Sequence, residues 1–193
     1  MQFTDLDISK NYTYADYLKW DFKERVELLL GKVFKMSPAP NSRHQILSIE
    51  ISGLLWHFLK RKKCRVFSAP FDVRLPHKNT LDEEIITVLQ PDICVICDTQ
   101  KIDKRGCLGA PDIVVEILSP NNNVLELNNK FDIYESAGVK EYWVVSPQDN
   151  TFLVNTLVNG KYSSSGPYVA GQKITTPILI GFSIDLEELF VVG

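Results

Sequence analysis

The sequence predicts an α/β (α+β) fold in which helices flank a central mixed β-sheet. Apolar strand patterns occupy the middle of the chain, and helical patterns lie towards both of its ends. The 193 residues contain no internal repeat and no Ser/Gly-rich linker. We therefore expect a single domain over residues 1–193, which is enough chain to bury a core without metals or disulfides.

Helical signals occur in four segments of the chain. Thr13 is the expected N-cap of a short helix that ends at Trp20. A long amphipathic helix is predicted over residues 42–60, and another over residues 124–137 with Gly138 at its C′ position. A short helix over residues 185–190 closes the chain. The apolar stripe of the long helix consists of Leu47, Ile51, Leu54, Leu55 and Phe58.

Strand patterns fill much of the remaining chain. Residues 26–36 predict two short strands around a turn at Gly31. The two most apolar strands are 85–97 and 111–118, which the charged loop 98–110 joins. The other predicted strands are 64–75, with a break near Pro70, then 141–146 and 151–158.

Charge and hydropathy exclude two broad classes of protein. The formal net charge of −3 excludes binding of nucleic acid by bulk attraction, so such a site needs a local basic patch or a bound cation. The longest apolar run, Ile93–Cys97, is far shorter than the roughly 20 residues of a membrane helix. The N-terminus lacks the pattern of a secretory signal. We therefore expect a cytoplasmic protein with no membrane partner.

The four cysteines fit a reducing cytosol. Cys94 and Cys97 form a CxxC, but residues three apart on a strand point to opposite faces, which argues against a shared metal. We expect both to be buried structural thiols. Cys64 and Cys107 have no Cys or His partner at zinc spacing.

Carboxylates inside apolar strands are the main chemical signal. Asp92 opens one apolar strand and Glu116 lies in the middle of the next, where an ionised carboxylate is costly unless it is paired or binds a metal. If these strands form a hairpin symmetric about residue 104, Asp92 faces Glu116 with Cβ atoms about 5 Å apart. Two carboxylates this close favour a divalent cation such as Mg²⁺ between them. The alternative is that Glu116 lies on a solvated face or pairs with a lysine.

Lys130 is a second anomaly, because it shares the inward face of its helix with Leu127 and Tyr134. It is placed to reach the carboxylates, or alternatively to snorkel at the helix edge. His44 lies on the apolar face of the long helix, and is either a member of the same site or a core or capping histidine. Glu27, at a strand start, is either a further ligand or an ordinary strand residue.

Three further charged features have simple structural explanations. Asp72 and Arg74 share a strand face, which predicts an ion pair. Asp112 follows a proline at a strand entrance, which fits a capping or turn role. The basic run 60–65 either complements the dipole of the long helix or contacts a phosphate backbone beside the cleft.

Carboxylates, a divalent cation and a lysine together form a hydrolytic group. The cation polarises a phosphodiester and lowers the pKa of bound water, and the ammonium offsets charge in the transition state. No P-loop, GxGxxG, HExxH or GxSxG motif competes with this interpretation.

Several blocks of the sequence together resemble one known family, the Uma-two type endonucleases of the PD-(D/E)XK, restriction-endonuclease-like superfamily. The resemblance covers about residues 12–190. The residues that carry it are Glu27, Gly31, Met36-Ser37-Pro38-Ala39-Pro40, His44, Pro70-Phe71-Asp72-Val73-Arg74-Leu75, Gln90-Pro91-Asp92, the segment from Gly109 to Pro120, Lys130, Tyr134 and the segment from Gly138 to Trp143.

The resemblance implies a restriction-endonuclease-like central mixed sheet and a nuclease site that depends on Mg²⁺ or Mn²⁺. Asp92 matches the Asp of the PD element, and Glu116 matches the acidic residue of (D/E)XK. Leu118 stands where the superfamily has its Lys, and in this family Lys130 from the next helix takes that role. His44 and Glu27 are similar to further members of the family's site.

The expected activity is endonucleolytic cleavage of nucleic acid, most simply DNA. The alternative is a catalytically silent nucleic-acid-binding or protein-interaction module on the same fold. Nucleases of this class often act in pairs, so a homodimer is one expected assembly, although no interface stripe is visible in the sequence.

Overall fold

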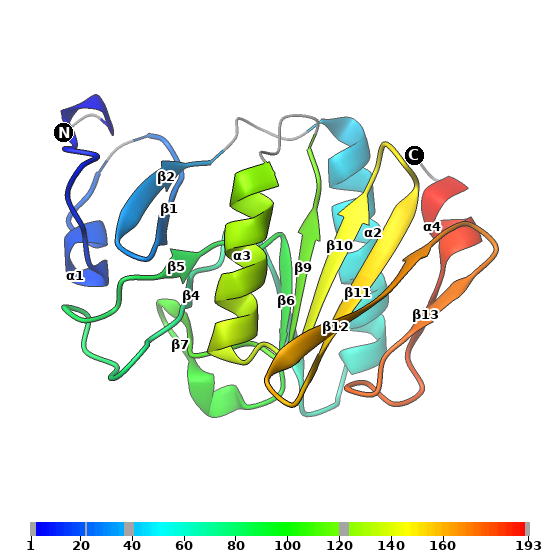
Figure 1. The fold of residues 1–193 in the computed structure, drawn as a ribbon. Coiled ribbons are helices and arrows are strands. Elements are labelled where there is room, and N and C mark those ends of the chain that lie inside the picture. Colours follow the sequence, from blue (N-terminus) through cyan, green and yellow to red (C-terminus); the bar gives the residue numbers. More distant parts are fainter. Residues whose placement is uncertain (1–2, 22, 37–40, 120–123, 192–193) are drawn as a thin grey trace.

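The central sheet of the computed structural model is a six-stranded mixed sheet (Figure 1). The structure describes residues 3–21, 23–36, 41–119 and 124–191. β9 and β10 are parallel and are joined by the crossover helix α3 (Val124–Ala137), whereas the other neighbours are antiparallel. In spatial order the strands are β12 (Lys161–Tyr168), β11 (Thr151–Val158), β10 (Glu141–Ser146), β9 (Ile113–Ile117), β6 (Ile93–Ile96) and β3 (Arg65–Ser68).

A second six-stranded sheet is built from shorter strands and is also mixed, since β4 and β8 are parallel. Tyr14 of α1 (Tyr14–Tyr17) packs against it, buried with Leu28 and Val88. Its order is β2 (Lys32–Lys35), β1 (Val26–Leu29), β5 (Val88–Leu89), β4 (Val73–Arg74), β8 (Gly106–Leu108) and β7 (Ile102–Asp103). The remaining elements are η1 (Phe3–Asp5), η2 (Thr99–Lys101), the pair β13 (Lys173–Thr175) and β14 (Ser183–Asp185), and α4 (Leu186–Val191).

Two long helices cover opposite faces of the central sheet, with α3 in front and α2 (Ser42–Leu59) behind in Figure 1. On the α2 side, Leu47 and Ile51 pack in one cluster with Ile93. On the α3 side, Tyr134 packs in another cluster with Cys94. Because strand residues alternate between faces, β6 and β9 contribute to both cores, which explains why they read as continuous apolar runs. The predicted fold class, helices around a mixed sheet, is confirmed.

Two predicted strands are each divided between the sheets, which corrects their boundaries. Residues 85–97 contain β5 of the second sheet and β6 of the central sheet, and residues 64–75 contain β3 and β4 in the same way. Pro91 and Pro70 lie at the two breaks. A proline has no N–H to give to a ladder, so the chain leaves one sheet there and enters the other.

Other differences have local causes. The predicted loop 98–110 contains η2 and the hairpin β7–β8, and β12 was not predicted because its Ser-Ser-Ser-Gly-Pro composition is typical of a loop. Leu54 of the predicted apolar stripe is 41% exposed, since it lies beside the buried row rather than in it.

The cysteine prediction is wrong for one pair, because Cys64 and Cys97 form a disulfide. Arg65 pairs with Ile96 across the antiparallel strands β3 and β6. Cys64, directly before Arg65, therefore faces Cys97, directly after Ile96. Cys94 and Cys107 are free and buried. The disulfide removes the cysteine argument for a reducing compartment. No helix in the described ranges is long and apolar enough to cross a membrane.

The two faces of α2 give a stability prediction. Ile51→Ala should lower the free energy of unfolding by about 2–5 kcal/mol, because it opens a cavity in a fully buried cluster. Leu54→Ala removes a similar side chain from the exposed side of the same helix, and should cost much less. Urea denaturation of both variants checks this, and equal losses would contradict the packing described for α2.

Candidate active site

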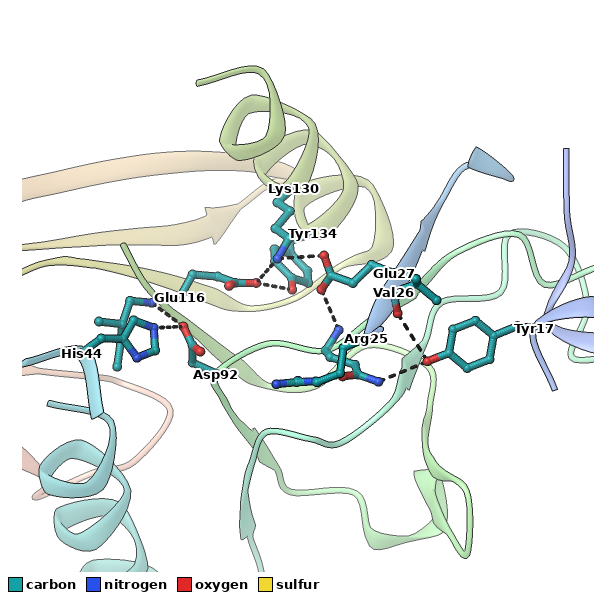
Figure 2. Close-up of polar contacts among 11 residues, drawn as sticks. Tyr17, Arg25, Val26, Glu27, His44, Asp92, Glu116, Lys130 and Tyr134 are labelled. Carbon is teal, nitrogen blue, oxygen red and sulfur yellow. Dashed lines mark hydrogen bonds and ion pairs between the residues drawn. The ribbon is translucent and has the colours of Figure 1, made fainter. Parts of the chain in front are cut away.

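The pairing of β6 with β9 brings two carboxylates together. The residue pairs Ile93–Val115, Cys94–Val114 and Val95–Ile113 have the register predicted from the sequence. One further step along the same register places Asp92 opposite Glu116. The N–H of Ile117 donates to Asp92 Oδ2 at 2.8 Å, which fixes the Asp92 carboxylate against β9 (Figure 2).

His44 approaches the same carboxylate from the N-terminus of α2. The side chain of Asn41 caps this helix by accepting the His44 N–H at 2.9 Å. His44 is buried, and its Nε2 lies 3.3 Å from Asp92 Oδ2. Burial alone would lower the pKa of His44, but its hydrogen bond to Asp92 and the charge of Asp92 outweigh burial and raise it. The predicted approach of His44 to the site is therefore observed.

Glu116 is held on its other side by α3. Lys130 Nζ lies 3.1 Å from Glu116 Oε1, and the hydroxyl of Tyr134 donates to the same oxygen at 2.9 Å. Lys130 is 4% exposed, so it does not snorkel to solvent. The sequence placed Tyr134 on the inward face of α3 as an apolar contact and missed its hydrogen bond, because periodicity reports only which side of a helix is buried.

Glu27 enters the site from the second sheet. Its Oε2 lies 3.1 Å from Lys130 Nζ, and its Oε1 accepts the backbone N–H of Gln90 at 2.8 Å. Lys130 thus contacts one carboxylate from each sheet. Both oxygens of Glu27 are engaged, one by Lys130 and the other by the Gln90 N–H.

A polar network that the sequence did not predict adjoins Glu27. The Gln90 side chain donates to Asp72 Oδ1 at 2.8 Å and to the Tyr17 hydroxyl at 3.1 Å, and its Oε1 accepts two bonds from Arg25. Asp72 therefore does not form the predicted ion pair with Arg74. Arg74 instead pairs with Asp103, with its Nη2 2.7 Å from Asp103 Oδ1.

Two other charged features lie outside the site. Asp112 accepts the N–H of Cys97 and pairs with Lys140, in agreement with its predicted role at a turn. The basic run 60–65 begins at the C-terminus of α2. His44 stands in the first turn of that 18-residue helix, so Lys60, where the run begins, lies about 20 Å from His44.

Comparison with known proteins identifies the family of this chain. A family model, Uma2, with the description "Putative restriction endonuclease", matches residues 14–187. The chain belongs to the Uma2 family. The Synechocystis protein "Uncharacterized protein slr1290" is 25% identical over 134 residues, which are 68% of this chain and 66% of that protein, just under two thirds.

A solved structure shows the same fold. It is described as "a putative nuclease belonging to DUF820" from Anabaena variabilis ATCC 29413. The two structures superpose with a TM-score of 0.73 at 19% identity, over 93% of this chain and 98% of that one. The restriction-endonuclease-like fold that the sequence predicted for this Uma2 protein is thereby confirmed.

The electrostatics of this Uma2 site centre on Glu116. Burial raises the pKa of Glu116 to about 7, the nearby charges of Asp92 and Glu27 act in the same direction, and the ammonium of Lys130 opposes them. Burial also raises the pKa of Tyr134 well above its usual value, so Tyr134 remains a hydrogen-bond donor at neutral pH. A carboxyl that titrates near neutrality stands out from ordinary surface glutamates.

The donor set fits a hard cation with few protein ligands. Among the described residues, Asp92 Oδ1 and Glu116 Oε2 accept no hydrogen bond, while the second oxygen of each carboxylate is held by protein donors. Within the described ranges no group of three or more His, Cys, Asp or Glu side chains is arranged to hold a metal ion. Two carboxylates completed by water and substrate oxygens suit Mg²⁺, whereas a structural zinc site needs four protein ligands.

Two charged neighbours, Lys130 and Glu27, should have opposite effects on the pKa of Glu116. Lys130→Met should raise the pKa of Glu116 above about 7, because the ammonium that favours the ionised form is lost. Glu27→Gln should lower it, because a like charge is removed. Titration of the glutamate Cδ resonances by ¹³C NMR in metal-free protein measures both. A shift in the same direction in both variants would show that Lys130 and Glu27 do not act on Glu116 as opposite charges.

The raised pKa of Glu116 also predicts how stability changes with pH. The pKa of Glu116 in the folded protein, about 7, exceeds its usual value of 4.5. The contribution of neutral Glu116 to the stability of the folded protein is therefore full below pH 4.5 and is lost as pH rises through 7. Glu116→Gln cannot ionise, and in metal-free protein it should gain stability relative to wild type between pH 5 and 8, on the order of 3 kcal/mol. Urea denaturation at both pH values tests this, with the exposed Glu83→Gln as control. A gain that is equal at both pH values would rule out Glu116 as the titrating group.

Proposed function

We propose that this protein is a metal-dependent endonuclease that hydrolyses phosphodiester bonds in DNA. The observation that carries the proposal is the opposition of Asp92 and Glu116 across β6 and β9, each with one open oxygen. Membership of a family described as "Putative restriction endonuclease" supports the same chemistry and favours DNA as substrate.

Asp92 Oδ1 and Glu116 Oε2 would hold Mg²⁺ or Mn²⁺. When bound, the ion would polarise the phosphodiester and lower the pKa of water. It also places positive charge beside the substrate, which the overall charge of −3 does not supply.

We propose that Lys130 acts in catalysis through the charge of its ammonium group. Its ammonium is buried within 3.1 Å of Glu116, close to where negative charge develops during attack on phosphorus. A fixed ammonium in a poorly solvated site stabilises such charge more strongly than one in water, because little reorganisation is needed. Its part is to orient the attacking water or to offset the charge of the transition state.

His44 and Glu27 are proposed as positioning residues. His44 holds Asp92 Oδ2, which fixes the orientation of that carboxylate. Glu27 holds Lys130 from the second sheet and stops its side chain from swinging away from Glu116. Loss of either residue should weaken catalysis less than loss of Asp92, Glu116 or Lys130.

The test begins with metal binding, which needs no assumption about sequence preference. Mn²⁺ should bind saturably to the metal-free protein in a calorimetric titration, and Asp92→Asn/Glu116→Gln should abolish that binding, because both open oxygens are altered. Glu83→Gln, which changes an exposed glutamate, is the control for loss of an acidic residue.

Cleavage is then measured on supercoiled plasmid with Mg²⁺ or Mn²⁺. Wild type should nick or linearise it, and Glu116→Gln and Lys130→Met should each lose at least about 100-fold in rate. Full metal-dependent cleavage by Glu116→Gln would refute the assignment. DNA binding that is equal in Mg²⁺ and EDTA, without cleavage, would instead identify a catalytically silent binding module.

A further inference from the structure

Arg25 stands at the edge of the site without a role in the chemistry above. It directly precedes β1, two residues before Glu27, and its side chain is exposed. Its Nε and Nη2 donate to Gln90 Oε1 at 3.0 and 2.7 Å. Gln90 lies two residues before Asp92 in the chain, so it links Arg25 to the segment that carries Asp92 (Figure 2).

The acceptor that holds Arg25 is itself fixed from several sides. The Gln90 N–H donates to Glu27 Oε1, and its amide Nε2 donates to Asp72 and to Tyr17. These bonds leave Gln90 Oε1 to face Arg25, so the orientation of the amide follows from its partners. The Tyr17 hydroxyl in turn contacts the Val26 carbonyl at 3.4 Å, which links α1 to the start of β1. Arg25 is therefore anchored to a rigid part of the second sheet.

The charge of Arg25 is available in a way that the charge of Lys130 is not. Lys130 is buried against Glu27 and Glu116. Arg25 is held by the neutral oxygen of an amide, and within the described ranges no carboxylate oxygen lies within 4 Å of its guanidinium nitrogens. Among the described residues, two of its five N–H groups find an acceptor, which leaves Nη1 and part of Nη2 to bind an anion. A planar guanidinium is well matched to phosphate oxygens.

We propose that Arg25, oriented by Gln90, binds a backbone phosphate of the nucleic acid next to the phosphate that is cleaved. The inference rests on the proposed function and adds to it the contact that places the substrate strand across the two carboxylates. Arg25 is thus a substrate-binding residue, and Gln90 is a positioning residue that acts through it.

The experiment compares Arg25→Ala and Arg25→Lys with wild type and with Arg61→Ala. Arg61 is an exposed arginine in the basic run at the far end of α2, so its loss removes the same charge away from the site. A short DNA duplex is used for cleavage with Mg²⁺, and for binding with Ca²⁺ in its place at several salt concentrations. Thermal unfolding and Mn²⁺ titration of each variant confirm that fold and metal site are intact.

Arg25→Ala should raise KM and the dissociation constant by about 10- to 100-fold and change kcat by less than about threefold, since the contact is to a non-reacting phosphate. The slope of log K against log salt should become shallower by about 0.9, as for one lost phosphate contact. Arg25→Lys should recover part of the affinity and most of the slope, because it keeps the charge but not the fork. Arg61→Ala should change neither quantity comparably.

Failures of the two proposals give different results. If wild type cleaves and Arg25→Ala keeps its KM and salt slope, the phosphate contact is refuted and the nuclease assignment stands. Equal effects of Arg25→Ala and Arg61→Ala would also refute it, because only net charge would matter. If wild type binds duplex but never cleaves, and Arg25→Ala alone loses the slope, the phosphate contact stands and the nuclease assignment fails. If wild type neither binds nor cleaves, both fail.

Discussion

Two buried carboxylates on different sheets face one ammonium group in this protein, and the site is organised around that contact. Glu116 belongs to the central sheet, Glu27 to the second sheet, and Lys130 to the helix that crosses the front of the central sheet. Removing the ammonium would leave two poorly solvated carboxylates without compensation, a costly arrangement. The requirement to satisfy these charges therefore holds the two sheets and α3 in one relative position, and the Asp92–Glu116 pair lies where they meet.

Much of this site could be predicted because regular structure carries it. The assumed symmetric hairpin register placed Asp92 opposite Glu116, and the helical period of 124–137 turned Lys130 inward. These are short-range rules that follow from backbone geometry. The helix 42–59 and its histidine at the first turn were predictable for the same reason.

The parts that escaped prediction depend on contacts with no periodic signal. Nothing local marks Gln90 as the acceptor for Arg25, since the two lie 65 residues apart and meet only when the sheets pack. The division of 85–97 between two sheets and the Cys64–Cys97 disulfide have the same origin, because both follow from which strands become neighbours. Hydrophobic pattern predicts that a strand is buried, but it does not identify the sheet to which the strand belongs.

Lys130 shows that an ammonium can reach the Glu116 carboxylate from a different element of the fold. The resemblance to the PD-(D/E)XK pattern implies a lysine at the position of Leu118, the residue directly after β9, whereas here an ammonium reaches Glu116 from α3. Each carboxylate of the pair gives one oxygen to donors of the protein and keeps the other open. The protein donors fix the two carboxylates before any ligand arrives, so a cation and a phosphate would meet a site that needs little rearrangement. In the proposed nuclease, the buried ammonium would lie beside the reacting bond, and the exposed guanidinium would bind the strand that carries this bond.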